Sequence, residues 1–419
     1  MNLLGIGKKY LLLTGALLAT MPVWAQKKIF IPEELRNNNF DCDTSQWSWK
    51  RSAQTPDLVF FWQKGFGDDW KNPPKLDGHD MHFNLLNLEK RVESFYHFFH
   101  DTLKFTKPGS KADRYKMMVM INYSLEGTAY GGTYDNFIGA LWVAPNRIQD
   151  EKLNCLAHEL GHCFQLQIPA DSMGDAWGGS GFYEMTSQWM LWQVNPDWVH
   201  DEQYHYDAFK KLTHLAFLHV ENIYHSPYVI EWWSELHGKP FIAELYREGK
   251  ANEDPVVTYK RLTHLTQSQF CDEMASGYCH LLNFDFSHAR KETRRYACTL
   301  NSTCVAANDG WLEPAASERP QQYGFNAFKL KLRPEAKSVK VSVKPDTAGT
   351  VRYAVVAVDA AGNSHYSAIK SEGNIKMKLP AHTSTCYFMV MGAPEQHLVN
   401  KAPSADDHMP VYGYKFKYK

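Results

Sequence analysis

Residues 157–165, Ala157-His158-Glu159-Leu160-Gly161-His162-Cys163-Phe164-Gln165, contain two histidines four positions apart, with a glutamate directly after the first. On a helix, residues four apart lie on one face, so both imidazoles can reach a single metal ion. Glu159 then points close to the same ion without ligating it, where a general base must lie to take a proton from a zinc-bound water. An apolar stripe predicts that this helix, over residues 150–166, is buried. The stripe consists of Leu153, Leu156, Ala157, Leu160, Cys163 and Phe164.

A zinc ion that keeps one position for water needs a third protein ligand. Metzincins would require glycine at position 165 and histidine at position 168, so Gln165 and Ile168 exclude that class. Glu184 lies 22 positions after His162, on a second expected helix over residues 181–194. This separation suits a short loop and an antiparallel helix. Glu184 is therefore placed where it could reach the two histidines.

The run from Gly181 to Trp189, Gly-Phe-Tyr-Glu-Met-Thr-Ser-Gln-Trp, resembles the Asn-Glu-x-x-Ser-Asp segment of the thermolysin-like gluzincins. In those enzymes the glutamate is the third ligand, so the resemblance implies one zinc ion, bound by His158, His162 and Glu184. Two positions differ, because Tyr183 replaces Asn and Gln188 replaces the Asp that orients a ligand histidine. The side-chain carbonyl of Gln188 can still accept an imidazole N–H, but it adds no charge. Further support for the histidines is expected from elsewhere, with Asp175 as a candidate.

Together with an export signal, these two motifs resemble a family of uncharacterised secreted bacterial proteins in which a gluzincin-like domain often carries β-sandwich modules. The resemblance covers residues 57–247 and extends, more distantly, to enhancin and mucin-degrading metallopeptidases. It implies that the strand expected at residues 138–143, after a glycine-rich turn at residues 127–132, is an edge strand that pairs with the substrate backbone. It also implies that a Tyr or His of the helical half stabilises the oxyanion. His225 and Tyr228 come first, because they cluster before an expected helix start; the other candidates are Tyr204, His205 and Tyr224.

The first 25 residues have the pattern of an export signal. Lys8 and Lys9 give a positive segment, residues 10–21 an apolar core, and Val23-Trp24-Ala25 a cleavage site of the small-residue type. The apolar run is too short to span a bilayer, and no later stretch approaches a transmembrane helix. We expect cleavage near Ala25 and a secreted or periplasmic protein without a membrane anchor.

Composition narrows the choice of partners. A formal net charge of −1 gives no reason to expect nucleic acid or an anionic membrane. The aromatic content of 14% suits packing, and also the binding of sugars or peptides.

Cys155 and Cys163 are expected to be small buried hydrophobic residues. An oxidising compartment would permit disulfides, with three pairings left open in the close group Cys271, Cys279, Cys298 and Cys304.

The order of the expected elements predicts an α+β protein. Residues 26–315 are expected to form a gluzincin-like zinc metallopeptidase domain, a mixed sheet followed by a helical half. The composition shifts to Asn, Ser, Pro and Ala around residues 299–322. Residues 316–419 then alternate in short runs, which predicts an accessory β-sandwich of immunoglobulin or fibronectin type. The runs are residues 327–332, 338–343, 352–358, 375–379, 386–391 and 412–418.

The ligand set predicts a zinc metallopeptidase that hydrolyses peptide bonds of proteins, peptides or glycoproteins, with Glu159 as general base. The alternative is a secreted carbohydrate- or glycoprotein-binding protein with a degenerate metallopeptidase domain. The aromatic content and the expected sandwich suit this alternative, but a degenerate site has no need of Glu159. A structural zinc site is disfavoured, because such sites usually have four ligands rich in cysteine. The sequence predicts no cleavage preference and no oligomeric state.

Overall fold

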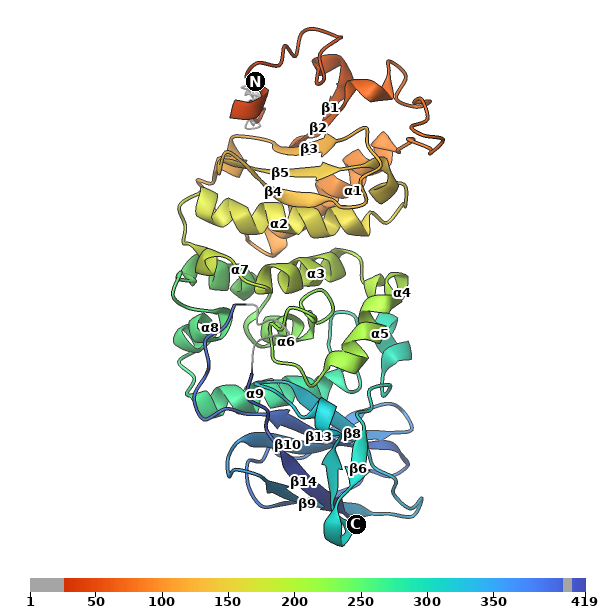
Figure 1. The fold of residues 1–419 in the computed structure, drawn as a ribbon, viewed down its shortest axis with the longest axis vertical. Helices are drawn as coiled ribbons and strands as arrows, with labels where there is room; N and C mark the ends of the chain where they lie inside the picture. The colour runs from red at the N-terminus through yellow and green to blue at the C-terminus, as the bar shows by residue number, and fades with distance from the viewer. Residues whose placement is uncertain (1–25, 402–408) are drawn as a thin grey trace, which may run out of the picture.

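The computed structural model of the protein describes residues 26–401 and 409–419, and the expected export signal lies outside them. The described chain forms three layers along its long axis (Figure 1): a mixed sheet, a layer of helices, and two further sheets at the C-terminal end. The predicted combination of α and β structure is thus confirmed. Within the described ranges, no helix is both long and apolar enough to cross a membrane.

The first sheet has five strands in the order β1-β2-β3-β5-β4. Its central strands, β2 (Leu58–Trp62), β3 (Met117–Ile121) and β5 (Ile138–Val143), are parallel. The first two of these are buried at every position, as is typical of parallel strands covered on both faces. At the two edges, β1 (Ser52–Gln54) and β4 (Tyr130–Tyr134) run antiparallel to their neighbours.

The expectation that residues 138–143 form an edge strand is wrong. These residues form β5, which lies between β3 and β4. The edge strand is β4, within a segment whose glycines suggested only a turn. Gly131 and Gly132 pair with Leu141 and Ala140 of β5, so the glycines extend the sheet by one strand.

Two helices, α1 (Leu85–His97) and α2 (Asn154–Ala170), pack against one face of this sheet. On that face, alternate residues of β2 such as Leu58 and Phe60 belong to the largest hydrophobic cluster of the described chain, the main core. The other residues of the strand face a smaller cluster formed with the N-terminal segment. The sheet thus supports α2 from behind, and α2 presents its opposite side to the helical layer below it (Figure 1).

The helical layer begins with α3 (Phe182–Val194), which lies against α2. After α5 (Gln203–Leu212), the carbonyl groups of Thr213 and His214 accept hydrogen bonds from the backbone of Phe325 and Gln321, so the helix does not continue. The remaining helices are α4 (Trp198–Asp201), α6 (Tyr228–His237), α7 (Pro240–Glu248), α8 (Pro255–Thr263), α9 (Gln267–Leu281) and α10 (Arg290–Thr293).

The C-terminal region consists of two antiparallel sheets, in the orders β11-β10-β13-β8 and β12-β9-β14-β7-β6. Apolar residues from both sheets share one core cluster, which includes Val341, Val355 and Phe388. All six runs expected to be strands fall on strands of these sheets. The strands are β6 (Cys304–Ala306), β7 (Leu312–Pro314), β8 (Phe325–Lys329), β9 (Ser338–Pro345), β10 (Val351–Asp359), β11 (Ser364–Tyr366), β12 (Asn374–Lys378), β13 (Thr383–Gly392) and β14 (Tyr414–Tyr418).

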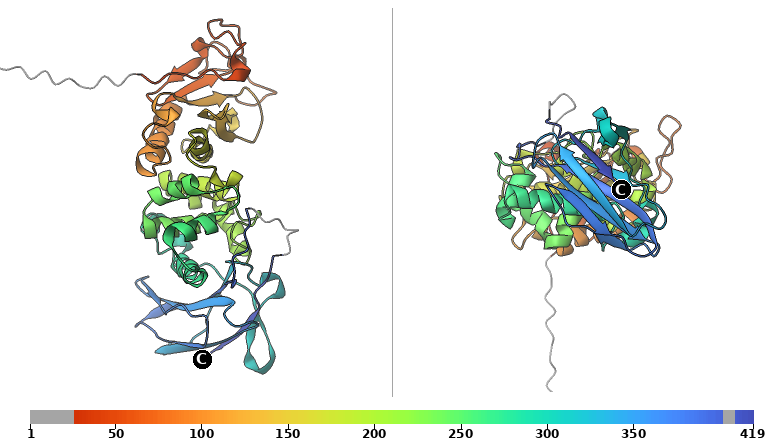
Figure 2. Two further views of the ribbon diagram at one scale, coloured as in Figure 1. Left: turned by 90° about the vertical axis from the view of Figure 1, so that its left-hand side faces the viewer. Right: turned by 90° about the horizontal axis from the view of Figure 1, so that it is seen from below.

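The expected domain boundary between residues 315 and 316 needs correction. Strands β6 and β7 precede it, yet they belong to the second C-terminal sheet. The first C-terminal sheet also shares a hydrophobic core with the helical layer. Val356 and Met389 belong to the same core cluster as the helices, and β10 packs on α9. Figure 2 (left) shows this sheet directly beneath the helices. The C-terminal sheets therefore form the end of one continuous body.

None of the eight cysteines, all within the described ranges, forms a disulfide. In the group expected to pair, Cys271 and Cys279 are buried on α9, while Cys304 is exposed on β6. Cys163 is a buried small residue, as expected, and its thiol contacts the carbonyl oxygen of Ala140 at 3.1 Å.

Candidate metal centre

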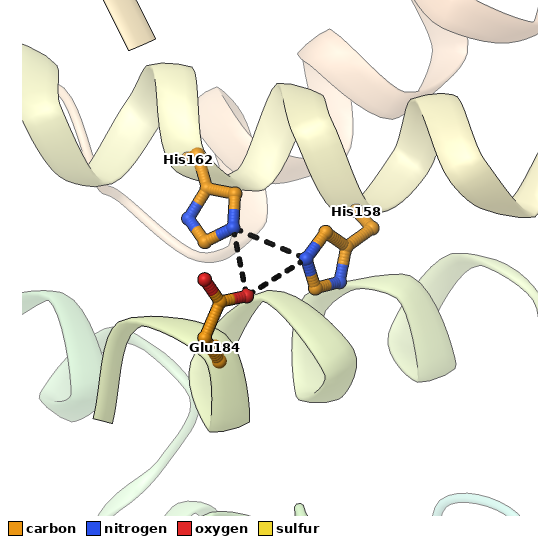
Figure 3. A group of neighbouring side chains, drawn as sticks. All are labelled: His158, His162 and Glu184. Carbon is orange, nitrogen blue, oxygen red and sulfur yellow. Dashed lines mark hydrogen bonds and ion pairs between the residues drawn. The ribbon is translucent and has the colours of Figure 1, made fainter. Parts of the chain in front are cut away.

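Helix α2 carries two histidines on the side that faces α3, and it begins directly after a residue with a left-handed backbone conformation. Leu153, at its start, has a left-handed backbone conformation, and its N–H donates to Oδ1 of Asp150 at 2.8 Å. Four residues apart, His158 and His162 extend from the same side of the helix (Figure 3). A Cβ atom on Gly161 would lie 2.8 Å from Oγ of Ser187, so this glycine allows α3 to approach closely.

The second helix supplies a carboxylate to the same point. His158 lies beside Gln188 while Gln165 lies beside Tyr183, so the two helices run antiparallel. Glu184 points from α3 toward both imidazoles (Figure 3). The structure thus brings together the three residues expected to bind the metal.

Three potential ligand atoms form a nearly equilateral triangle. The Nε2 atoms of His158 and His162 lie 3.1 Å apart, and each lies 3.1 Å from Oε2 of Glu184. Tetrahedral zinc with bonds of about 2.0–2.1 Å separates its ligand atoms by about 3.3–3.4 Å, so this triangle fits a zinc ion. The three side chains are 12%, 11% and 25% exposed, in the order His158, His162 and Glu184, which leaves the centre accessible to solvent.

The charge on Glu184 also suits a metal ligand. Burial raises the pKa of this carboxyl group, but hydrogen bonds from His158 and His162 outweigh burial and hold the pKa well below its ordinary value. The group is therefore ionised at neutral pH, which is the form that binds metal ions.

Two glutamines hold the imidazoles from behind. Oε1 of Gln188 lies 3.2 Å from Nδ1 of His158, as expected from the sequence, and Oε1 of Gln165 lies 3.0 Å from Nδ1 of His162. An amide carbonyl at Nδ1 keeps a proton on that nitrogen, so an imidazole that gives up its Nε2 proton can bind a metal there. The expectation for Asp175 is wrong, because that side chain accepts from the backbone of Trp177 and Ala251 instead.

Glu159 follows His158 on α2 but lies outside the triangle of ligand atoms. Burial raises the pKa of its carboxyl group, against the opposing effect of the two histidines and of a backbone hydrogen bond from Gly131. That glycine belongs to β4, and a Cβ atom added to it would lie 2.0 Å from the carbonyl oxygen of Glu159. The edge strand therefore touches the helix at the expected general base.

Tyr224 is the tyrosine that the structure places at the centre. Its ring lies 6.2 Å from that of His158, at an interplanar angle of 25°, and 43% of the residue is exposed. Burial raises the pKa of its hydroxyl group, and so do the charge of Glu184 and a hydrogen bond with it. Tyr224 was among the five sequence candidates but was not ranked first.

The two residues ranked first lie elsewhere. Tyr228 is buried among aromatic rings such as Trp192 and Phe209, and within the described structure its hydroxyl group has no hydrogen-bond partner. His225 lies with its Nδ1 atom 2.6 Å from Nδ1 of His205, and burial together with the charge of His205 lowers its pKa to about 4. Neither contacts the triangle, so the structure does not support them as oxyanion donors.

The last two candidates are also accounted for. His205 lies 3.2 Å from the side-chain nitrogen of Gln188, so it reaches His158 only through that amide. Tyr204 is 62% exposed on α5, and its ring packs at a tilt of 36° against His205, with the ring centroids 4.2 Å apart. Sequence reasoning missed the contact between Gln165 and His162. The position of Gln165, three residues after His162 on a helix, was a usable signal, because residues at this spacing are neighbours.

The fold and the centre define a mixed α and β protein with a His-His-Glu cluster between two antiparallel helices. The chain belongs to the DUF6055 family, a family of unknown function, whose sequence pattern matches residues 22–419. No curated protein matches the chain.

Similarity to solved structures is slight. One is a chain in the crystal structure of accessory secretory proteins 1, 2 and 3 from Streptococcus pneumoniae, with a TM-score of 0.19 and 9% identity over 29% of this chain and 86% of that one. Another belongs to the glycosylation-associated Gap123 complex from Streptococcus agalactiae, with a TM-score of 0.18 and 8% identity over 28% and 39%.

Proposed function

We propose that the protein is a zinc-dependent peptidase in which His158, His162 and Glu184 hold one zinc ion. The observation that carries this proposal is the triangle of ligand atoms with edges of 3.1 Å. The carbonyl groups of Gln188 and Gln165 orient the imidazoles of His158 and His162. Three protein ligands are typical of catalytic zinc, whereas structural zinc usually has four.

The surrounding residues suit hydrolysis of an amide bond. Zinc bound by three protein ligands keeps one position for water and lowers the pKa of that water to near neutrality. Glu159 accepts a proton from the attacking water and passes it to the leaving amine nitrogen. The hydroxyl group of Tyr224 donates to the carbonyl oxygen as negative charge develops there.

An extended peptide is the substrate class that the edge strand favours. One side of β4 pairs with β5, and within the described residues no strand pairs with its other side. Free backbone groups at a sheet edge can bind a peptide as an added strand. Because Gly131 of β4 touches Glu159, a peptide bound in this way passes the general base.

We also propose the types of domain, the export of the chain and the location of its substrates. The first sheet and the helical layer form a gluzincin-like domain, and the C-terminal sheets form a β-sandwich attached to it. Residues 1–25 direct the chain out of the cytoplasm, so its protein, peptide or glycoprotein substrates are periplasmic or extracellular. A binding protein with a degenerate centre is the weaker alternative, because a degenerate centre would have no need of two oriented imidazoles beside Glu184 and Glu159.

Metal analysis tests the proposal directly. Purified protein comprising residues 26–419 should contain one zinc ion per chain, lose it to 1,10-phenanthroline, and regain it with added zinc. Cleavage of a quenched fluorescent peptide mixture and of mucin should follow the zinc content. The matched control is the double variant His158→Ala/His162→Ala, which should contain no zinc. Wild-type protein without zinc, or full zinc content in the double variant, would refute the proposal.

A further inference from the structure

The outer face of the last sheet carries a dense array of lysines. In β9, β12 and β14, residues such as Val341, Met377 and Phe416 point into the core, so the alternate residues point outward. Seen from below, this sheet lies in front of the rest of the molecule (Figure 2, right). We call the outward set the lysine face: Lys340, Lys344, Lys376, Lys378, Lys415 and Lys417.

These lysines lie in positions that weaken the sheet. Lys376 is directly opposite Lys340, and Lys415 is directly opposite Lys344. Like charges directly opposite one another destabilise antiparallel strands. Among the described residues, the lysine face has one ion pair, between Lys415 and Glu313 at 4.0 Å. Folding alone therefore does not account for this array.

The charge is concentrated in a few segments. Residues 329–344, 374–382 and 414–419 contain eleven Lys and Arg residues and a single acidic side chain, Glu335. The whole chain has a formal net charge of −1. These three segments are therefore strongly positive in a chain that is nearly neutral as a whole, and they can attract a polyanion.

A cavity of about 1050 Å³ adjoins the lysine face. It lies at one end of the two C-terminal sheets, with walls from β8, β11, β12 and β13 and from the loops beside them. Apolar residues such as Leu330 and Leu379 line it, and Lys378 belongs both to the cavity and to the lysine face. Its other strong cations are Lys329, Arg333 and Lys337.

We propose that the lysine face and this cavity bind an acidic polysaccharide, a chain of sugars that carries carboxylate or sulfate groups. Cations directly opposite each other on neighbouring strands lie about 4.8 Å apart. Along a strand they lie about 6.7 Å apart in β12 and β14 and about 13 Å apart in β9, which forms a regular array for a linear polyanion. Between the lysines, Ser338, Ser342 and Asn374 offer hydrogen bonds to sugar hydroxyl groups. The site does not involve the metal centre, so it is independent of the proposed function.

The residue types on the face favour a polysaccharide over two other polyanions. Arginine is the preferred side chain for nucleic-acid phosphates, and aromatic rings stack on single-stranded bases. The outward positions of β9 and β12 hold neither. Proteins that lie on a membrane insert apolar side chains into the lipid, and these positions hold none of those either.

Binding of chondroitin sulfate to residues 26–419, measured over a series of salt concentrations, tests the proposal. The variant Lys340→Gln/Lys344→Gln/Lys376→Gln/Lys415→Gln should bind at least about tenfold more weakly and with a flatter dependence on salt, since fewer counterions are released. The matched control replaces four exposed lysines of the N-terminal half by glutamine and should bind like wild type. These are Lys64, Lys75, Lys90 and Lys107.

Stability separates lost binding from lost folding. The single change Lys376→Glu converts a like-charge pair with Lys340 into an opposite-charge pair, so it should raise the melting temperature while weakening binding. Equal affinity of wild type and the quadruple variant would overturn the proposal. So would tighter binding of double-stranded DNA, of phosphatidylglycerol vesicles or of neutral dextran than of chondroitin sulfate at the same salt concentration.

Discussion

Gln188 accepts a hydrogen bond from His158, with 3.2 Å between Oε1 and Nδ1, from a position one helical turn after Glu184 on α3. Its side-chain nitrogen lies 2.9 Å from the carbonyl oxygen of Tyr224 and 3.2 Å from Nε2 of His205. These contacts on the nitrogen side fix which way the amide faces, so its oxygen is turned toward the imidazole. A single helix thus supplies one candidate ligand, Glu184, and orients another, His158.

The first prediction concerns this orienting role. Gln188→Leu should lower zinc affinity about 10–100-fold, the usual effect of removing a group that orients a metal ligand. Competition with a chelating dye measures the affinity. Gln167→Leu is the matched control, since Gln167 lies on α2 but bonds to the backbone of Gly139 and Phe137 rather than to a ligand histidine. An equal loss in both variants would show that helix packing, not orientation, is responsible.

The second prediction separates metal binding from chemistry. Glu159→Gln should keep full zinc content but lower peptide hydrolysis by at least about 100-fold, the usual contribution of a general base. Glu184→Ala should instead lower zinc affinity, because it removes one corner of the ligand triangle. Wild-type zinc affinity in Glu184→Ala would mean that the third ligand is another residue.

The third prediction uses two tyrosines four residues apart. Tyr224→Phe should lower kcat about 10²–10³-fold with unchanged zinc content, the usual result of removing one donor to an oxyanion. Tyr228→Phe should leave kcat unchanged, because that hydroxyl group is buried away from the centre without a partner. Steady-state kinetics on one peptide compares the two. A large fall in kcat for Tyr228→Phe at an unchanged melting temperature would contradict this assignment.

The fourth prediction concerns adjacent glycines of β4. Gly131→Ala places a Cβ atom 2.0 Å from the carbonyl oxygen of Glu159, so it should destabilise the fold by about 1–3 kcal/mol and disturb the general base. Gly132→Ala meets atoms no closer than 3.8 Å, and its effect should stay within about 0.5 kcal/mol. Urea unfolding measures both. Equal stability of the two variants would mean that β4 can move away from α2.

Sequence reasoning grouped the three candidate ligands because their positions follow from helix geometry. The spacing of His158 and His162 fixes their common face, and a second helix packed against the first limits where Glu184 can lie. The same reasoning placed Gln188 correctly, since one helical turn separates it from Glu184. Most C-terminal strands were also predictable, because their apolar residues alternate.

The errors arose where contacts join distant parts of the chain. Tyr224 lies in a loop, and no local pattern shows that the loop folds back over Glu184. Strand β4 carries two glycines, which are poor strand formers in isolation and are held here by pairing with β5 and by contact with α2. The domain boundary was misplaced because β6 and β7 are only three residues long and contain no alternating pattern.

The last prediction concerns the C-terminal sheets, for which the sequence suggested an independent unit. In the structure, Met389 is fully buried in the main core, and the N–H of Gly181 donates to the carbonyl oxygen of Lys401 at 2.6 Å. A chain ending at Ser317 would uncover the apolar side of α9, so we expect it to aggregate and to lose zinc.

A point variant tests the same continuity without truncation. Met389→Ala should destabilise the whole chain by about 2–5 kcal/mol, the usual cost of a large-to-small change in a core. The exposed control Glu372→Ala should stay within about 0.5 kcal/mol of wild type. Because both layers share one core, urea should unfold the sheets and release zinc in a single transition. Separate transitions, with zinc retained after the sheets unfold, would show that the C-terminal region is an independent domain after all.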